Sequence, residues 1–251
     1  MTASSGDLSR RACLAGVLAA CASLGARRAG AAARAATEQR PISGVHSVRW
    51  EASGELSIEQ TGREQLSIEA EPAVLAKIVT EVREGRLSIR FAPGRVETRE
   101  PIRFRLELKT LAALDAHGAG TLRLGPLDVP TLSLRLGGSD DLRLTRLTAH
   151  FLDARLDGSG DVTVDAGQVE RQKILLRGSG RFDAPGLASR EATAVIEGSG
   201  EIRLAVAERL DAAIAGSGDV LFVGQPRLVQ NVTGAGEVRR LRPQEVSAQK
   251  P

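Results

Sequence analysis

The stretch LDGSGDVTV at residues 156–164 contains the phrase that decides the fold. Its five-residue centre, GSGDV, recurs with variations so that the chain holds seven copies. Successive copies are separated by 20, 20, 20, 20, 18 and 18 residues, and they start at Gly118, Gly138, Gly158, Gly178, Gly198, Gly216 and Gly234. Self-similarity at a nearly fixed period of this length is typical of stacked structural repeats. The repeats therefore indicate the architecture of most of the chain.

Apolar residues recur at fixed places around each phrase. The residue two positions before the leading glycine is Ala116, Leu136, Leu156, Leu176, Ile196, Ile214 or Val232. The residue four positions after it is Leu122, Leu142, Val162, Phe182, Ile202, Val220 or Val238. The alternation with polar neighbours such as Arg143 and Thr163 indicates strands. Stacked at about 4.8 Å, equivalent strands would align these residues into a narrow continuous core.

The sequence therefore predicts an all-β protein with a parallel β-solenoid (β-helix) of about seven coils of 18–20 residues over residues 115–241. We expect the glycines to form the corners between strands, because a sharp corner favours positive φ and glycine adopts it without steric cost. These structural corner glycines are Gly118, Gly120, Gly138, Gly158, Gly160, Gly178, Gly180, Gly198, Gly200, Gly216, Gly218, Gly234 and Gly236. Asp140 takes the place of the second glycine in the second copy, so that corner is expected to differ locally.

The segment before the repeats is expected to belong to the same domain. Residues 44–114 contain short runs that alternate apolar with polar, such as RLSIRF at 86–91, and these indicate a strand-rich region that could cap the solenoid. Pro72 and an apolar spacing of three to four residues predict a short helix within 72–79. Residues 36–43 are polar and are expected to be a linker, and residues 242–251 a polar tail.

Residues 1–35 are interpreted as an export signal. The twin arginines Arg10 and Arg11 precede an apolar run from Ala12 to about Ala26, which is shorter than the roughly 20 residues needed to span a bilayer. Two endings of the signal fit the residues. One is simple cleavage after the small-x-small sequence that ends at Ala35. The other is lipoprotein cleavage before Cys21, with Cys21 as a possible lipidation site.

Removal of this segment changes the charge argument. The whole chain carries 34 basic and 31 acidic residues, and residues 1–35 hold five arginines and one aspartate, which leaves 29 basic and 30 acidic residues in the exported part. Nucleic-acid binding therefore loses its compositional support. Both cysteines, Cys13 and Cys21, also lie in the signal, so we expect neither a disulfide nor a cysteine-based metal site in the exported part.

The residue that follows the second glycine of each phrase is acidic in five of the seven copies. It is Thr121, Asp141, Asp161, Arg181, Glu201, Asp219 or Glu237. Stacked carboxylates repel one another unless a cation or an arginine lies among them. One hypothesis is a Ca²⁺-binding edge. The alternative, which we favour, is a solvated edge in which Arg181 relieves the repulsion. The three histidines, His46, His117 and His150, have no partner at a metal-ligand spacing and are expected on the surface or in turns.

Two parts of the sequence together resemble one known family. They are the recurring GSGDV phrase and the lead-in ISGVHSVRWEASGELSIEQTGREQLSIEAEPAVLAKIVTEVREGRLSIRF, which continues to IRFRLELKTLAALDAHGAG. This combination, over residues 42–241, is similar to the head GIN-domain family of exported bacterial proteins, described as auto-transporter adhesin heads. The resemblance implies a β-solenoid and a location in the cell envelope or on the cell surface. It supplies no catalytic residues.

We therefore expect a non-enzymatic exported protein with a binding, adhesion or structural role at the bacterial cell envelope. It would reside in the periplasm or on the surface, and would contact the membrane only through a lipid on Cys21. No cofactor, catalytic residue or nucleic-acid partner is predicted. The expected partner is an unidentified envelope or extracellular ligand, and self-association is possible through a solenoid edge. The alternative is a carbohydrate-active or other envelope enzyme that uses the acidic edge.

Overall fold

The computed structural model describes residues 35–242, and the export signal with Cys21 and most of the tail lie outside this range. Residues 35–242 form twenty strands and one short helix. In chain order they are β1 (Ala36–Arg40), β2 (Ser47–Glu51), β3 (Ser53–Gln60), β4 (Gln65–Ala70), α1 (Pro72–Leu75), β5 (Ile78–Arg83), β6 (Arg86–Phe91), β7 (Arg103–Leu108), β8 (Ala113–Ala116), β9 (Ala119–Leu124), β10 (Leu127–Asp128), β11 (Thr131–Leu136), β12 (Asp141–Leu144), β13 (Leu147–Gly158), β14 (Asp161–Val164), β15 (Gly167–Gly178), β16 (Arg181–Gly198), β17 (Glu201–Gly216), β18 (Asp219–Val223), β19 (Arg227–Gly234) and β20 (Val238–Arg240).

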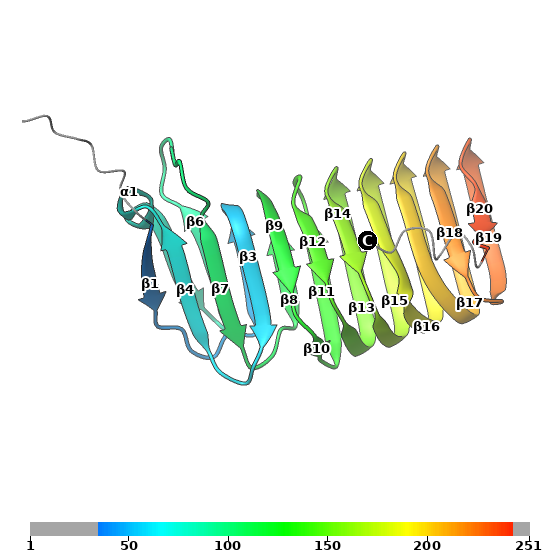
Figure 1. Cartoon of the computed structure of the whole chain (residues 1–251). Coiled ribbons are helices and arrows are strands. Elements are labelled where there is room, and N and C mark those ends of the chain that lie inside the picture. The colour runs from blue at the N-terminus through cyan, green and yellow to red at the C-terminus, as the bar shows by residue number, and fades with distance from the viewer. Residues whose placement is uncertain (1–34, 243–251) are drawn as a thin grey trace, which may run out of the picture. The chain divides into compact units, whose positions relative to one another are not determined.

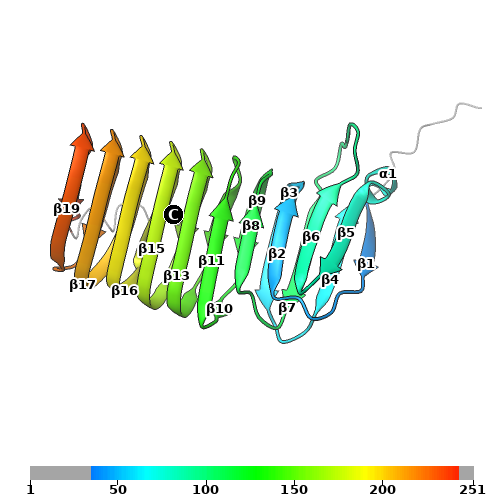
Figure 2. The ribbon, with the colours of Figure 1, turned by 180° about the vertical axis from the view of Figure 1, so that it is seen from behind.

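The described residues form a parallel β-solenoid, as predicted. One face stacks β8, β11, β13, β15, β16, β17 and β19 in that order, and the other stacks β9, β12, β14, β16, β17, β18 and β20 (Figures 1 and 2). The long strands β16 and β17 bend and contribute to both faces. Equivalent residues of consecutive coils lie side by side, so Gly158 is opposite Gly178 and Gly178 is opposite Gly198.

The core consists of aliphatic rows that run from coil to coil. Leu142, Val162, Phe182, Ile202 and Val220 are all fully or almost fully buried and occupy equivalent positions in consecutive coils. Phe182 is the aromatic member of this row, and two further buried aromatic residues lie before the repeats. Trp50 and Phe104 meet edge to face, with ring centroids 4.9 Å apart, in the N-terminal part. The rows bury apolar surface continuously, which is the main stabilising contribution in a protein of this kind.

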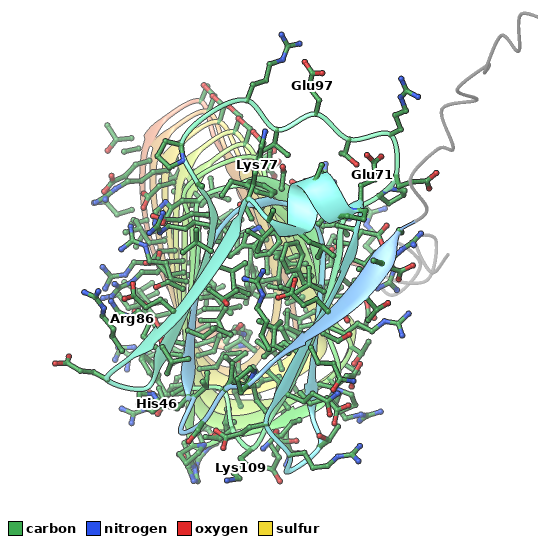
Figure 3. All side chains as sticks on the ribbon, turned by 90° about the vertical axis from the view of Figure 1, so that its left-hand side faces the viewer. His46, Glu71, Lys77, Arg86, Glu97 and Lys109 are labelled. Atoms are coloured by element: carbon green, nitrogen blue, oxygen red, sulfur yellow. The ribbon has the colours of Figure 1, made fainter. Side chains whose placement is uncertain are left out.

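The N-terminal strands extend the solenoid out of chain order. β2 lies between β8 and β6, and β3 lies between β9 and β7, in each case with parallel pairing. Beyond β7 the pairing becomes antiparallel, because β4 pairs with β7 and β1 pairs with β4. On the other face β5 pairs antiparallel with β6. The antiparallel strands and α1 therefore close this end of the solenoid (Figure 3).

Two expectations for this region are corrected by the structure. Residues 36–40, expected in a linker, form β1, because Ala36 packs against the core and the Arg40 guanidinium donates hydrogen bonds to the carbonyl oxygens of Ile78 and Leu75 at 2.8 and 3.2 Å. The helix expected within 72–79 ends at Leu75. From Ile78 onward the chain pairs with β6 instead, and the extended pairing outweighs a weak helical pattern.

A loop over residues 92–101 lies against the same end. The Glu71 carboxylate accepts hydrogen bonds from the backbone N–H groups of Arg99 and Glu100 at 2.8 and 3.2 Å, and the first of these is the main cause that lowers the pKa of Glu71. The Lys77 ammonium donates to the carbonyl oxygen of Arg95 at 2.6 Å. Figure 3 shows Glu71 and Lys77 beside the helix. These bonds attach the loop to the closed end.

The corner glycines are required chiefly because consecutive coils approach each other closely. Positive φ occurs at the leading glycine of the last four phrases only, at Gly178, Gly198, Gly216 and Gly234. A Cβ on the second glycine would instead lie 2.1–2.3 Å from the carbonyl oxygen of the coil before, at Gly160, Gly180, Gly200, Gly218 and Gly236. No real Cβ tolerates such a distance from backbone. The expectation of positive φ thus holds for part of the ladder, and close stacking explains the rest.

Asp140 makes a different corner, as its sequence position suggested. Its side chain is fully buried, and its two carboxylate oxygens accept hydrogen bonds from the backbone N–H groups of Gly118 and Gly120, each at 2.7 Å. The carboxylate therefore ties the corner of its own coil to the corner of the coil before. Charge-assisted bonds of this type are stronger than neutral ones and offset the cost of burying the charge.

We predict that Gly180→Ala destabilises the protein by about 1–3 kcal/mol, because the new Cβ would meet the Gly160 carbonyl oxygen at 2.3 Å and would force the two coils apart. Ser179→Ala, in the same corner with an exposed side chain, is the matched control and should change stability by less than about 0.5 kcal/mol. Urea denaturation of both variants measures the difference. Equal midpoints for the two variants would contradict the stacking explanation.

Candidate binding groove

The acidic edge lies where the glycine corners lead into the second face. Arg181 lies between Asp161 and Glu201, with its guanidinium 3.7 and 3.3 Å from their carboxylates. The Asp161 carboxylate also accepts the backbone N–H of Arg181 at 2.9 Å, and Asp219 accepts that of Glu237 at 2.9 Å. The acidic residues therefore form a ladder along one edge, with an arginine inside it and backbone donors bound to it.

A shallow hollow of about 210 Å³ lies at this edge, between the corners of the last coils. Beside it, on the second face, burial is the largest cause that raises the pKa of Asp183, while Arg203 and Arg181 act in the opposite direction. The carboxylates at the hollow are already bound to arginines and backbone N–H groups. Among residues 35–242 no group of three or more His, Cys, Asp or Glu side chains could hold a metal ion. The Ca²⁺ hypothesis stays a prediction.

A larger groove, of about 650 Å³, lies where the chain returns from the second face to the first. It crosses β10, the first residues of β13 and β15, and the middle of β16 and β17, along the lower edge of the solenoid in Figure 1. Three rows of equivalent residues line it, because the returns stack in register. We call the groove and its lining the return groove; the lining residues are Asp128, Val129, Pro130, Thr148, Ala149, His150, Gln168, Val169, Glu170, Ala188, Ser189, Arg190 and Ala207.

The middle row of the groove is apolar or small. Val129 and Val169 are buried, Ala149 lies between their two coils and is half-buried, and Ser189 follows in the next coil. The alanines Ala188 and Ala207 are exposed at the end of the groove toward β17. Short side chains at these positions leave the hollow open, since a longer side chain would project into it. The surface that a ligand would meet here is therefore mainly hydrocarbon.

One outer row carries charges that are paired with each other. The Nδ1 atom of His150 lies 3.0 Å from the Glu170 carboxylate, and the Arg190 guanidinium donates to Glu208 at 2.9 and 3.3 Å. The contact with Glu208 is the main cause that raises the pKa of Arg190. Each pair joins consecutive coils. The row therefore offers a ligand a polar margin in which the charged groups are already bound to one another.

The groove ends where the coil shortens from 20 to 18 residues. Between β16 and β17 the register jumps from Ala184 opposite Leu204 to Ala188 opposite Ala205, and it shifts again after Ser189. At this break the carbonyl oxygen of Ala205 accepts the Ser189 hydroxyl at 2.8 Å and the Gln172 amide at 3.3 Å. Two buried polar side chains thus satisfy a backbone group at the register break.

The sequence patterns did not reveal this groove. The glycine phrases and acidic positions that they singled out lie on the opposite corner, and of the three histidines only His150 lies in the groove. The sequence signal for the groove is weaker than that for the glycine corners. Residues 128–130, 148–150, 168–170 and 188–190 recur at the same period as the phrases, but they share no residue type.

Comparison with known proteins connects this fold to a family. The family described as "Putative auto-transporter adhesin, head GIN domain" matches residues 46–226. The chain belongs to this family. The match covers β2 to β18 completely and includes the return groove. No curated protein sequence matches the chain.

Solved structures share the fold of this head GIN-domain protein. A "putative adhesin" from Bacteroides fragilis is 20% identical, with a TM-score of 0.79, and the match covers 83% of this chain and 97% of that one. A "Putative lipid binding protein" from Parabacteroides distasonis is 23% identical, with a TM-score of 0.67 and the same coverage. A "putative adhesin" from Parabacteroides merdae is 17% identical, with a TM-score of 0.66. At these identities the likeness concerns the fold. Within residues 35–242, no helix has the length and apolar character to cross a membrane.

We predict opposite effects for the two polar residues beneath the groove. Ser189→Ala should destabilise the protein by about 1–3 kcal/mol, because the Ala205 carbonyl and the Gln172 amide each lose a hydrogen bond to the hydroxyl at 2.8 Å and keep only the longer bond between them, at 3.3 Å. Gln172→Leu should be neutral or stabilising, because the Oε1 atom of Gln172 is buried without a hydrogen-bond partner and a leucine, Leu152, occupies the equivalent position in the coil before. Thermal unfolding compares the variants. A larger loss for Gln172→Leu than for Ser189→Ala would refute the assignment.

Proposed function

We propose that this protein is a non-enzymatic, exported binding protein of the bacterial cell envelope, and that its return groove holds the apolar chain of an amphipathic molecule. The observation that carries the proposal is the lining of the groove, where apolar and small residues lie between a row of paired charged groups and a second polar row of Asp128, Thr148 and Gln168. Concave, mainly apolar sites with a few polar groups are the usual form of small-molecule binding sites.

The chemistry of the lining favours an apolar chain over a peptide or a sugar. The backbone groups of the returns are bonded from coil to coil, as in the donation from Val129 to Thr148 and from His150 to Pro130, so an extended peptide would find few free partners. The side chains offer no Trp, Tyr or Phe surface for a sugar ring to stack on. A hydrocarbon chain needs no hydrogen bonds, and each buried CH₂ contributes about 0.8 kcal/mol.

The paired carboxylates of the acidic edge support a role without catalysis. Catalytic acids usually converge in a concave site and keep a free position for substrate. Here Asp161 and Glu201 are bound to Arg181, and the large groove lies on another corner of the coils. The description of one solved structure with this fold as a lipid-binding protein agrees with an apolar ligand. Adhesion to a lipid-bearing surface would use the same contact.

The proposal predicts saturable binding of a fluorescent fatty-acid analogue, dansyl-undecanoic acid, to the chain that starts at residue 36. Ala188→Trp fills the groove and should weaken binding at least tenfold. Ala215→Trp is the matched control, because Ala215 is exposed on β17 and does not line the groove. Both variants are first checked for an unchanged melting temperature. Absence of saturable binding, or equal affinity in the two variants, would reject the groove as the binding site.

A further inference from the structure

The outer edge of β19 is unpaired within the part of the chain that the structure describes. β19 pairs with β17 on one side, with Arg227 to Gly234 opposite Arg209 to Gly216. All of its residues are exposed. Leu228, Val229 and Val232 have 37%, 47% and 38% of their surface accessible, and together with Val82 they are the exposed large hydrophobic residues of the described chain. An apolar strand therefore ends one face of the solenoid.

The strand lacks the features that normally protect such an edge. Natural sheets block edge pairing with lysines, prolines, bulges or inward-pointing charges. The sequence RLVQNVTG contains one charged residue, Arg227, at its start, and no proline. Its register with β17 is continuous, without a bulge. The row in β20 that is apolar in earlier coils instead ends in Arg240, opposite Phe222, so β20 carries an inward charge of the protective kind.

The inward side of β19 continues the core. Leu228, Gln230 and Val232 lie opposite Leu210, Ala212 and Ile214, which are buried. The next layer that would cover them is missing from the described chain. At the other end of the solenoid, β1, β4, β5 and α1 provide such a layer. The two ends thus differ. The outer edge of β5 also lacks a strand partner among the described residues, but there the Arg40 guanidinium donates hydrogen bonds to the Ile78 carbonyl oxygen and the Thr80 hydroxyl, whereas no charged side chain lies within β19 after Arg227.

We propose that β19 pairs antiparallel with β19 of a second copy of this chain. Centring the two-fold axis on Gln230 places Leu228 opposite Val232 of the second copy and keeps the inward rows facing each other, because residues on one side of a strand alternate with a period of two. Arg227 then lies opposite Thr233 of the second copy, so the two Arg227 side chains do not face each other within the paired strands. The strand is therefore complementary to itself.

The contact is self-limiting. A two-fold interface uses the same patch on both copies, so forming it consumes both open edges. At the other end the outer strand β1 is short and mostly polar, and its Arg40 guanidinium is bonded to Ile78 and Thr80 of β5, so these edges carry the charged protection that β19 lacks. The expected product is a dimer rather than a filament. This inference does not depend on the return groove or on its ligand.

Sedimentation velocity over a range of concentrations tests the pairing with the chain that starts at residue 36. The wild-type chain should show a concentration-dependent monomer–dimer equilibrium. Gln230→Lys places two like charges opposite each other at the axis and should shift the protein to monomer. Gln225→Lys makes the same charge change at an exposed site before β19 and should leave the dimer intact. A wild-type monomer at all concentrations, or a dimer equally stable in both variants, would overturn the proposal.

Cross-linking tests the register itself. The chain from residue 36 contains no cysteine, so single cysteines report on one contact each. Gln230→Cys should form a disulfide-linked dimer, because residues opposite each other in antiparallel strands have Cα atoms about 4.5–5.5 Å apart. Thr233→Cys should not, since its two copies would lie roughly 20 Å apart. Equal cross-linking of both would contradict the register. A dimer that forms only after removal of residues 243–251 would show that the tail occupies the edge, and would also overturn the proposal.

Discussion

The fold depends on one close contact, the approach of glycine backbone in each corner to the carbonyl oxygen of the corner before. The ideal Cβ positions at 2.1–2.3 Å from those oxygens show that no side chain fits there. When the corners stack this closely, the strands on both sides lie at the hydrogen-bonding distance of a β-sheet, about 4.8 Å apart. The aliphatic residues of equivalent strands then align into rows. The parallel pairing, the narrow core and the regular outer rows all follow from this contact.

Function in such a scaffold arises where the regularity changes. Along the corner ladder the same close backbone approach recurs from coil to coil, apart from the corner at Asp140, and the carboxylates beside it are bound to arginine and backbone N–H groups. The return side varies more, because its residues share no type and the coil shortens between β16 and β17. Small residues such as Ala149 and Ala188 leave a groove there. At its end the side chains of Ser189 and Gln172 donate hydrogen bonds to the backbone carbonyl oxygen of Ala205. The β19 edge is a second place where the regular repeat changes, because the stack of strands on this face ends there without a charged residue in the middle of the strand.

The repeats allowed the solenoid, its parallel coils and the family to be predicted from the sequence. This was possible because each copy carries glycine at the corner where consecutive coils approach most closely. Asp140 could be recognised as an irregular corner, but its two hydrogen bonds to the preceding coil depend on stacking that one coil does not encode. β1 and the early end of α1 were missed because antiparallel pairing with β4 and β6 outweighs the local polar or helical pattern. The groove was missed because three unlike residues from each of several coils create it, and none of them is distinctive alone.

Amide hydrogen exchange at the corners tests the stacking contact most directly. The serines between the corner glycines have exposed side chains, yet the backbone N–H groups of Ser179, Ser199 and Ser217 donate to the carbonyl oxygens of Gly158, Gly178 and Gly198 at 3.0–3.1 Å. If the corners hold the coils together, these amides exchange only through global unfolding, with protection equal to that of the buried strands. Exchange at the rate of an exposed turn, while the strands stay protected, would show that the corners merely connect strands that stack for other reasons.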